Sequence, residues 1–499
     1  MEEDVIVETT HGKIRGYIRR GVIKFKGIPY AAPPVGELRF KPPAPFEPWS
    51  GVRDATKYSP VSIQPPSNLE NMFAEPMPQS ESDCLTLNIW TQNYKDDKRP
   101  VMFWIHGGGF ITGNGASLDG SRLVLRGDVV VVSINYRLGY FGFLYMPDMP
   151  DTTANAGLLD MVAALEWVRD NISKFGGDPN NVTIFGESAG GMAVSSLLAF
   201  PSAKGLFHRA IPQSGAANKF GYNPDAAIKV YEELIQKFGV EKGDIEALRK
   251  VPAEKFIVPQ MDMTEFRAGG LRVGPVVDKK TLPDHPLEAI SKGFAKDIDV
   301  FIGSNLDENK LFLMWTPKAF ELTEEGLNRT VNAFMRFTKQ KESKAKEIID
   351  TYRELRKTPR NIADAILSDF TFRIPSIRLA EEQSKYQKNI YMYLFTWQSP
   401  LDGGKYGAMH ALELSFVFGL LGNRDIGIVP GRTEETQRLS EQMMDAWIAF
   451  ARSGNPNHKN IPELPPYDKK NRATILFDKE VTVETDPYGN ERATWDGII

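Results

Sequence analysis

A serine that could act as a nucleophile stands at residue 188, within the run Gly-Glu-Ser-Ala-Gly over residues 186–190. The apolar stretch Val182–Phe185 precedes this run and the Ala- and Leu-rich stretch Met192–Phe200 follows it, which predicts a buried strand, a tight turn and a helix. The two glycines lack Cβ atoms, so strand and helix can approach closely and hold the serine at a strained backbone position. Because a serine hydroxyl is a weak nucleophile by itself, the pattern predicts covalent catalysis assisted by a histidine.

A second glycine-rich run could supply hydrogen-bond donors to a negatively charged oxygen. Val101–Ile105 reads as a buried strand and leads into His106 and three consecutive glycines, Gly107–Gly109. Backbone donors fixed in place before reaction stabilise a tetrahedral intermediate, and the loss of one typically costs about 3–4 kcal/mol of barrier. A phosphate-binding loop is the alternative, but neither G-x-x-x-x-G-K-[ST] nor a helix-opening G-x-G-x-x-G occurs here. His-Gly-Gly-Gly followed by G-x-S-x-G is the order expected of lipases and esterases.

Two of the six histidines are candidates for the base. The serine, acid and histidine of such a site follow each other in that chain order. His410 comes after the strand-like Asn389–Trp397 and just before the apolar Leu412–Phe418, in a loop near the C-terminus where the histidine is needed. His285 stands before a proline and precedes the best acid candidates, which breaks the order.

The acid candidates follow another apolar stretch, Val300–Ile302, which reads as a buried parallel strand. Asp307 and Glu308 come at its carboxyl end, where open α/β sheets place their sites. Either carboxylate could orient an imidazole and stabilise it as a cation. A solvated acidic turn is the alternative, and residue chemistry alone does not choose between the two acids.

Longer motifs resemble those of the type-B carboxylesterases, the family that includes cholinesterases and bacterial p-nitrobenzyl esterases. Phe175–Gly190 is similar to the family's serine signature and Asp83–Trp90 to its second signature. The resemblance spans Gly12 to about Tyr467. The further motifs in the family's order are Asn135-Tyr136-Arg137, Gln213-Ser214-Gly215, His410-Ala411-Leu412-Glu413 and Gly454-Asn455-Pro456.

This resemblance implies an α/β-hydrolase fold and a role for each candidate residue. It makes Ser188 the nucleophile, His410 the general base and Glu308 the acid. It also implies that Ser214 is a hydroxyl near this triad. The implied oxyanion donors are the backbone N–H groups of Gly108, Gly109 and Ala189. No metal or organic cofactor is required for this chemistry, and no H-E-x-x-H motif occurs.

Several residues depart from the family pattern. Asn309 stands where the family has a glycine after the acid, and Asn tolerates left-handed backbone better than most residues, so we expect the turn to survive. Ala411 replaces the glycine usual after the histidine, a small change. Cys84 is the only cysteine, and Ser62 stands about where its disulfide partner would be in many eukaryotic members, so that disulfide cannot form.

Composition restricts partners and location. The 499 residues include 60 basic and 64 acidic side chains, a formal net charge of −4, so nucleic acid is not an implied partner. A single cysteine excludes an intrachain disulfide, and the lack of a disulfide favours a reducing compartment. It also excludes any Cys-pair zinc site. Met1–Asp4 is acidic without a signal-like pattern, and no run of about 18 apolar residues could span a membrane. We expect a cytoplasmic protein with no membrane partner, with export through a removed leader as the alternative.

The strand and helix patterns predict an α/β chain with a large, mostly parallel central sheet flanked by helices. Val5–Trp49 suggests a small antiparallel meander followed by a proline-rich stretch, and amphipathic helices are expected after Ala154 and near Glu434–Ser453. We expect one catalytic domain over residues 1–499, with mainly helical cap or gorge-wall regions at about 224–283 and 316–382. The predicted strands are Leu85–Trp90, Val101–Ile105, Val129–Asn135, Val182–Phe185, Ala210–Gln213, Asp299–Gly303, Ile390–Phe395 and Thr474–Phe477.

These residues favour a serine hydrolase that cleaves small to medium neutral or aromatic esters through an acyl-enzyme. One alternative is a non-catalytic binding or adhesion protein of the same fold, which the intact serine, histidine and acid argue against. Another is an amidase or carbamate hydrolase with the same triad. The oligomeric state is not readable from the sequence. Six side chains are candidates to line a substrate pocket, although core packing is the simpler explanation for each: Met263, Phe266, Leu271, Phe312, Leu313 and Met314.

Overall fold

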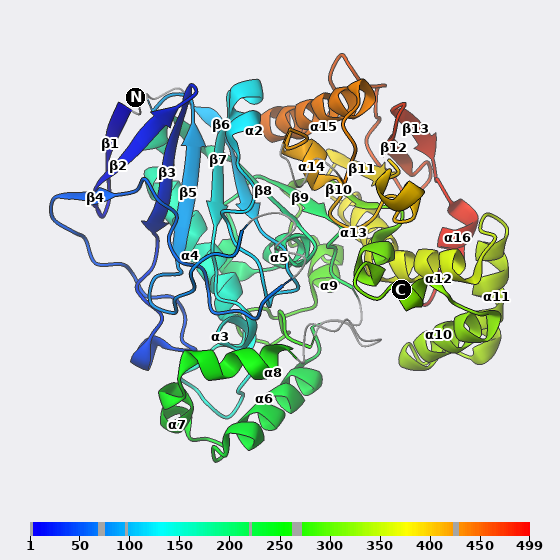
Figure 1. The fold of residues 1–499 in the computed structure, drawn as a ribbon, viewed down its shortest axis with the longest axis horizontal. Coiled ribbons are helices and arrows are strands. Elements are labelled where there is room, and N and C mark those ends of the chain that lie inside the picture. The colour runs from blue at the N-terminus through cyan, green and yellow to red at the C-terminus, as the bar shows by residue number, and fades with distance from the viewer. Residues whose placement is uncertain (1–2, 68–74, 95–97, 219–221, 262–271, 423–428) are drawn as a thin grey trace. The chain divides into compact units, whose positions relative to one another are not determined.

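The computed structural model describes residues 3–67, 75–94, 98–218, 222–261, 272–422 and 429–499 (Figure 1). These residues cluster in two compact units. The first includes Met1–Ile211 and the second includes Pro212–Phe220 and Ile290–Ile499. The expectation of one catalytic domain over the whole chain stays a prediction.

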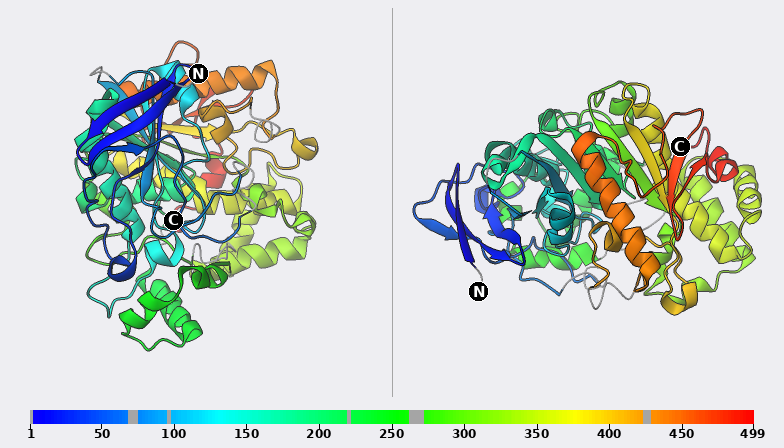
Figure 2. Two further views of the ribbon diagram at one scale, coloured as in Figure 1. Left: turned by 60° about the vertical axis from the view of Figure 1, so that its left-hand side comes forward. Right: turned by 90° about the horizontal axis from the view of Figure 1, so that it is seen from above.

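The first unit contains a twisted sheet with the strand order β1-β2-β3-β5-β7-β6-β8. Strands β1, β2 and β3 pair antiparallel, which confirms the predicted N-terminal meander (blue in Figure 2). Strand β6 lies between β7 and β8 and is parallel to both. The strands are β1 (Glu3–Thr9), β2 (Gly12–Arg19), β3 (Val22–Pro29), β4 (Val52–Asp54), β5 (Thr86–Thr91), β6 (Arg99–Ile105), β7 (Val130–Ile134) and β8 (Gly177–Glu187).

The central strands of this sheet are buried on both faces. Every residue of β5, β6 and β7 is buried, as expected for near-continuous apolar strands covered on both sides. In the parallel pair, Ile105 at the end of β6 is in register with Gly186 near the end of β8. The glycine-rich loop after β6 and the serine turn after β8 therefore leave the sheet at the same end, the carboxyl end of these parallel strands.

Helices complete the first unit. Helix α5 directly follows β8, and α6, α7 and α8 gather together below the sheet in Figure 1. These last three confirm helical structure in the described part of the segment 224–283. The helices are α2 (Ser121–Gly127), α3 (Gly139–Phe143), α4 (Ala156–Asn171), α5 (Ala189–Leu197), α6 (Pro224–Phe238), α7 (Ile245–Lys250) and α8 (Ile257–Met261).

The second unit is built on the parallel strands β10, β11 and β12, with β13 antiparallel at the edge. Trp447 of α15 packs against Phe301 of β10 and Tyr393 of β11, with ring centroids 4.9 and 5.1 Å apart, so this helix belongs to the core as its pattern predicts. The strands are β10 (Asp299–Asn305), β11 (Ile390–Phe395), β12 (Ala473–Phe477) and β13 (Thr482–Thr485). The helices are α10 (Glu324–Phe337), α11 (Glu342–Arg353), α12 (Pro359–Ser368), α13 (Ile374–Gln383), α14 (Leu414–Val417), α15 (Glu434–Ser453) and α16 (Gly489–Ala493).

All eight predicted strands are present, although their ends differ by up to five residues. Strand β9 (Arg209–Gln213) and helix α9 (Pro286–Ser291) each begin in the first unit and end in the second. Helices α10–α13 confirm the mainly helical segment 316–382. The short strands β4 and β13 are not foreseen by the sequence. Within the described ranges, no helix combines the length and the apolar character that crossing a membrane requires.

Candidate active site

Ser188 occupies the predicted turn between β8 and α5 in the first unit. Its backbone has φ 57° and ψ −122°, a region that a residue with a Cβ rarely adopts and that costs about 1–3 kcal/mol. Added Cβ atoms at Gly186 and Gly190 would lie 2.6 and 2.1 Å from the carbonyl oxygen of Ile105. Only glycine fits at both positions, and this close approach forces the tight turn. The half-buried Ser188 side chain thus stands where a helix begins.

The glycine-rich loop after β6 lies beside this serine. A Cβ added at Gly107 would lie 3.2 Å from the Cβ of Ser188. Gly108 and Gly109 have φ values of 98° and 64°. The carbonyl of Gly108 accepts hydrogen bonds from the N–H groups of Ile111 and Thr112, and these bonds close the loop. Among the described residues, no acceptor is found for the backbone N–H groups of Gly108, Gly109 or Ala189. Three predicted oxyanion donors are therefore available in one unit with the serine.

His106 supports this loop as a neutral ring. Burial lowers its pKa from the ordinary 6.5 to about 4, so the imidazole is uncharged at neutral pH. Its ring stacks on Tyr136 with centroids 4.4 Å apart, and its Nδ1 donates to the carbonyl of Gly107 at 2.9 Å. The Tyr136 hydroxyl donates to the carbonyl of His106. These contacts fix the start of the loop.

His410 and Glu308 come together in the second unit. Nδ1 of His410 and Oε2 of Glu308 are 2.5 Å apart, and both side chains are almost completely buried. The other carboxylate oxygen of Glu308 accepts the backbone N–H of Asn305 at 2.7 Å. Both oxygens are thus engaged, and the carboxylate fixes the ring orientation and the tautomer of the histidine. Asp307 instead pairs with Lys310 at 2.9 Å, so Glu308 is the one of the two acids that is bonded to the histidine.

Two aromatic rings flank His410. Phe312, in the 3₁₀ helix η5 (Glu308–Leu313), and Phe372, in the π-helical turn η7 (Asp369–Arg373), lie 5.3 and 4.7 Å from it between ring centroids. His410 and Glu308 are buried beside these apolar neighbours, and a low local dielectric strengthens the hydrogen bond between them. Phe312 was a candidate pocket residue, and it contacts the ring of the histidine rather than packing in a remote core.

A buried carboxylate behind this pair has no role in the sequence analysis. Glu413 accepts hydrogen bonds from Asn305 Nδ2 at 2.7 Å and Gln213 Nε2 at 3.1 Å. Trp447 Nε1 donates to Gln213 Oε1, and so orients that amide toward the acid. Burial and the nearby negative charge of Glu308 raise the pKa of Glu413 to about 7. The available signal was a lone carboxylate within the apolar run Leu412–Phe418, three residues after the histidine.

Ser214 also lies in the second unit, one residue after Gln213. It is completely buried, its φ is 44°, and its N–H donates to the carbonyl of Gly303 at 2.9 Å. Its hydroxyl has no hydrogen-bond partner in the described part of the chain. The proposed closeness of this hydroxyl to the triad stays a prediction.

The two departures from glycine have unequal consequences. Asn309 lies inside η5 and not in the left-handed region, so the tolerance expected of asparagine there is not used. Its side chain donates to Asp364 Oδ1 at 2.7 Å instead. Ala411, by contrast, has φ 63°. The replacement of glycine by alanine, expected to be a small change, places a Cβ in a conformation that favours glycine.

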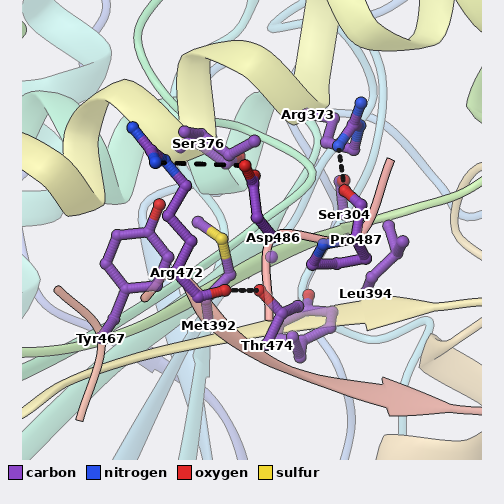
Figure 3. A pocket seen from close by; sticks show the side chains of 13 residues that line it. Ser304, Arg373, Ser376, Met392, Leu394, Tyr467, Arg472, Thr474, Asp486 and Pro487 are labelled. Carbon is purple, nitrogen blue, oxygen red and sulfur yellow. Dashed lines mark hydrogen bonds and ion pairs between the residues drawn. The ribbon is translucent and has the colours of Figure 1, made fainter. Parts of the chain in front are cut away.

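His285, the other candidate histidine, belongs to the first unit. His285 contacts the edge of Tyr222 and accepts the N–H of Leu287 at the start of α9, which is a structural role. Leu313 and Met314 are half-buried, whereas Met263, Phe266 and Leu271 fall outside the described residues. A separate cavity in the second unit has room for about one water molecule and contains none of the predicted site residues (Figure 3).

The comparisons with known proteins agree with this picture. The model of the Carboxylesterase family matches residues 3–495. The para-nitrobenzyl esterase of Bacillus subtilis is 40% identical over 98% of this chain and 97% of its own, and the phenmedipham hydrolase of Pseudarthrobacter oxydans is 34% identical over 95% of both. A solved carboxylesterase of Geobacillus stearothermophilus is 39% identical, with a TM-score of 0.88 over 98% of this chain and 99% of its own. The predicted α/β-hydrolase fold is confirmed, and the chain belongs to the carboxylesterase family.

Proposed function

We propose that this chain hydrolyses carboxylic esters with Ser188 as nucleophile, His410 as general base and Glu308 as the acid that supports it. The observation that carries the proposal is the buried 2.5 Å hydrogen bond between Glu308 Oε2 and His410 Nδ1. This bond commits Nδ1 to the carboxylate and leaves Nε2 as the nitrogen that can exchange a proton. The proposal requires Nε2 to reach the hydroxyl of Ser188.

The reaction would follow the order set by these groups. Ser188 Oγ attacks the ester carbonyl carbon while His410 takes the hydroxyl proton, and the carbonyl electron pair moves to the oxygen. The tetrahedral intermediate then collapses, the alcohol leaves with the proton from His410, and an acyl-enzyme remains. Water, deprotonated by the same histidine, attacks the acyl carbon and releases the acid. Glu308 stabilises the imidazolium that forms in each half-reaction.

The negative oxygen would be held by the N–H groups of Gly108, Gly109 and Ala189. Their support comes from the approach of the glycine-rich loop to Ser188 at Gly107, from the place of Ala189 directly after Ser188, and from the lack of other acceptors in the described residues. The N–H of Ala189 also opens α5, where the helix dipole adds a partial positive charge. Donors fixed by the fold stabilise charge that develops in the transition state without reorganising during the reaction.

Small to medium neutral or aromatic esters are the proposed substrates. The rings of Phe312 and Phe372 beside His410 favour apolar acyl or alcohol groups over charged ones. One relative carries the name para-nitrobenzyl esterase, which fits an aromatic alcohol portion. The helical segments 224–283 and 316–382 are proposed to wall the substrate pocket.

A chain-length series of p-nitrophenyl esters, from acetate to octanoate, tests the substrate class. We expect saturable hydrolysis with a maximum at short to medium acyl chains, and incubation with paraoxon should leave one phosphoryl adduct, on Ser188. Paraoxon labelling of another residue, or no hydrolysis of any ester, would reject the proposal. Turnover of a matched amide or carbamate faster than the ester would move the chain to the alternative hydrolase classes.

We also propose a cytoplasmic location. Cys84 is the single cysteine and is buried, so the fold contains no disulfide that an oxidising compartment would be needed to form. Fractionation of cells that produce the protein from its own gene tests this, and esterase activity outside the cytoplasmic fraction would contradict it.

A further inference from the structure

Gln64 is a buried glutamine whose side chain is bonded to the exit of the glycine-rich loop. Its Oε1 accepts the backbone N–H of Gly113 at 2.8 Å, and its Nε2 donates to the carbonyl of the same residue at 3.0 Å. Nε2 also donates to the carbonyl of Ser62 at 3.1 Å. The side chain is only slightly exposed, and each of its polar atoms has a partner. The Gln64 amide therefore exchanges a pair of hydrogen bonds with the Gly113 backbone, as two residues do in a hydrogen-bonded pair of antiparallel strands.

Gly113 transmits this contact to the proposed oxyanion donors. A Cβ there would lie 2.4 Å from Nδ1 of His106 and 2.6 Å from the carbonyl oxygen of Gly107, so its backbone lies directly against the start of the loop. The carbonyl of Gly108 accepts from the N–H of Thr112 at 2.9 Å, immediately before Gly113. The loop is therefore a closed turn whose two ends meet at Gly113.

The segment that carries Gln64 is itself fixed. The N–H of Gln64 donates to Oε1 of Gln79 at 2.9 Å. Val61 pairs with the same stretch, donating to the carbonyl of Pro78 and accepting from the N–H of Ser80, both at 2.9 Å. Gln64 thus reaches the loop from an anchored backbone, which is what a residue must have to hold another group in place.

We propose that Gln64 is a positioning residue that sets the orientation of the Gly108 and Gly109 N–H groups toward the developing oxyanion. The inference rests on the proposed function of these donors. Oxyanion donors act only when they lie about 3 Å from the negative oxygen, and a misplacement of about 1 Å can cost about 100-fold in rate. Without the Gln64 amide, the N–H and the carbonyl of Gly113 both lose their hydrogen-bond partner, and the closed turn can rotate.

The test compares Gln64→Leu and Gln64→Glu with wild type. Leucine keeps approximate volume and removes all three hydrogen bonds, whereas glutamate keeps an acceptor for Gly113 but faces two carbonyl oxygens with a carboxylate. Active sites are counted by paraoxon titration taken to completion, so misfolded protein does not enter the rate. The readouts are kcat per titrated site and KM for p-nitrophenyl butyrate, and Ki for an aliphatic trifluoromethyl ketone, whose adduct with the serine carries an oxyanion.

We expect Gln64→Leu to lower kcat per titrated site about 10- to 100-fold with KM within about threefold. The trifluoromethyl ketone should bind more weakly by a similar factor, because it depends on the same donors. Gln64→Glu should also lose kcat. Gln383→Leu is the matched control, since Gln383 is a fully buried glutamine that likewise donates to two loop carbonyls, those of Ala295 and Ile298. It should lower the melting temperature and leave kcat per site within about twofold.

Two outcomes would overturn the inference. If Gln64→Leu lowers the melting temperature as Gln383→Leu does but keeps the wild-type kcat per site and ketone Ki, Gln64 serves stability alone. If the loss appears in KM and not in kcat, the loop acts on substrate binding rather than on the oxyanion. A wild-type protein that hydrolyses no ester and titrates no site would reject the proposed function itself, and the inference with it.

Discussion

The carboxylate of Asp307 accepts the backbone N–H of Ala408 through Oδ2 at 3.0 Å, while the N–H of Asp307 donates to the carbonyl of Ala408 at 2.9 Å. Glu308 follows directly in sequence, and His410 stands two residues beyond Ala408. Two acidic neighbours therefore hold the histidine together, one through its backbone and one through its ring. Asp307 fixes the backbone of the histidine loop to the acid turn, and Glu308 orients the imidazole. Lys310, paired with Asp307 at 2.9 Å, keeps that carboxylate in place.

Replacement of each acid by its amide should separate these roles. Glu308→Gln keeps an acceptor for His410 but removes the charge that, in the proposed mechanism, stabilises the imidazolium, so we expect kcat to fall about 10³- to 10⁴-fold. Asp307→Asn keeps an acceptor for Ala408 and should lower kcat less than about tenfold. Steady-state hydrolysis of p-nitrophenyl butyrate measures both. The reverse ranking would assign the catalytic acid to Asp307.

Substitutions at Ser188 should distinguish its chemistry from its strain. Ser188→Ala removes the proposed nucleophile and should abolish p-nitrophenyl butyrate turnover while the protein stays folded. Ser188→Gly should be equally inactive but more stable than Ser188→Ala by about 1 kcal/mol, because φ 57° strains any residue with a Cβ. Activity is followed by p-nitrophenolate release and stability by urea denaturation. Turnover by Ser188→Ala, or equal stability of the two variants, would contradict this account.

The sequence predicts the strand–turn–helix at Ser188 because its determinants are local. Two glycines, an apolar strand and an adjacent helix suffice, and contacts to Ile105 explain why each glycine is required. The glycine loop is predictable for the same reason.

Long-range polar contacts were not predictable in the same way. Gln64 and Gly113 are 49 residues apart, and nothing in the local pattern of a lone glutamine indicates its partner. Glu413 is a similar case, since its partners Asn305 and Gln213 come from distant strands. The choice between Asp307 and Glu308 required side-chain direction, which residue type does not encode. The family resemblance pointed to Glu308, which is bonded to the histidine in the structure, but it says nothing about the role of Asp307.

Ala411→Gly should stabilise the protein. Ala411 has φ 63°, where a Cβ costs roughly 1–2 kcal/mol, whereas glycine loses about 0.4–1 kcal/mol through the extra freedom of the unfolded chain. The difference predicts a net gain of roughly 0 to 1.6 kcal/mol. Urea denaturation of both proteins measures it, with kcat as the check that the histidine loop is intact. A loss of stability would mean that the Ala411 side chain, which is almost fully buried, contributes more by packing than its backbone loses.

Glu413 should give the protein a stability that falls as pH rises. Burial and the charge of Glu308 raise its pKa from the ordinary 4.5 to about 7, so between these values the folded protein binds a proton that the unfolded chain has released. The stability linked to Glu413 is therefore fully present below about pH 4.5 and is lost as the pH rises through about 7. From pH 5 to pH 7.5 the loss amounts to about 2 kcal/mol.

Glu413→Gln removes this titration and isolates it from every other group. The amide stays neutral at all pH values, but its NH₂ must face one of the two amide donors that Glu413 accepts, so the variant is less stable throughout. The gap in unfolding free energy between wild type and variant should be larger at pH 5 than at pH 7.5. Urea titrations of both proteins at the two pH values measure that gap. A constant gap would show that the two amide donors hold Glu413 ionised, and that burial does not control its protonation.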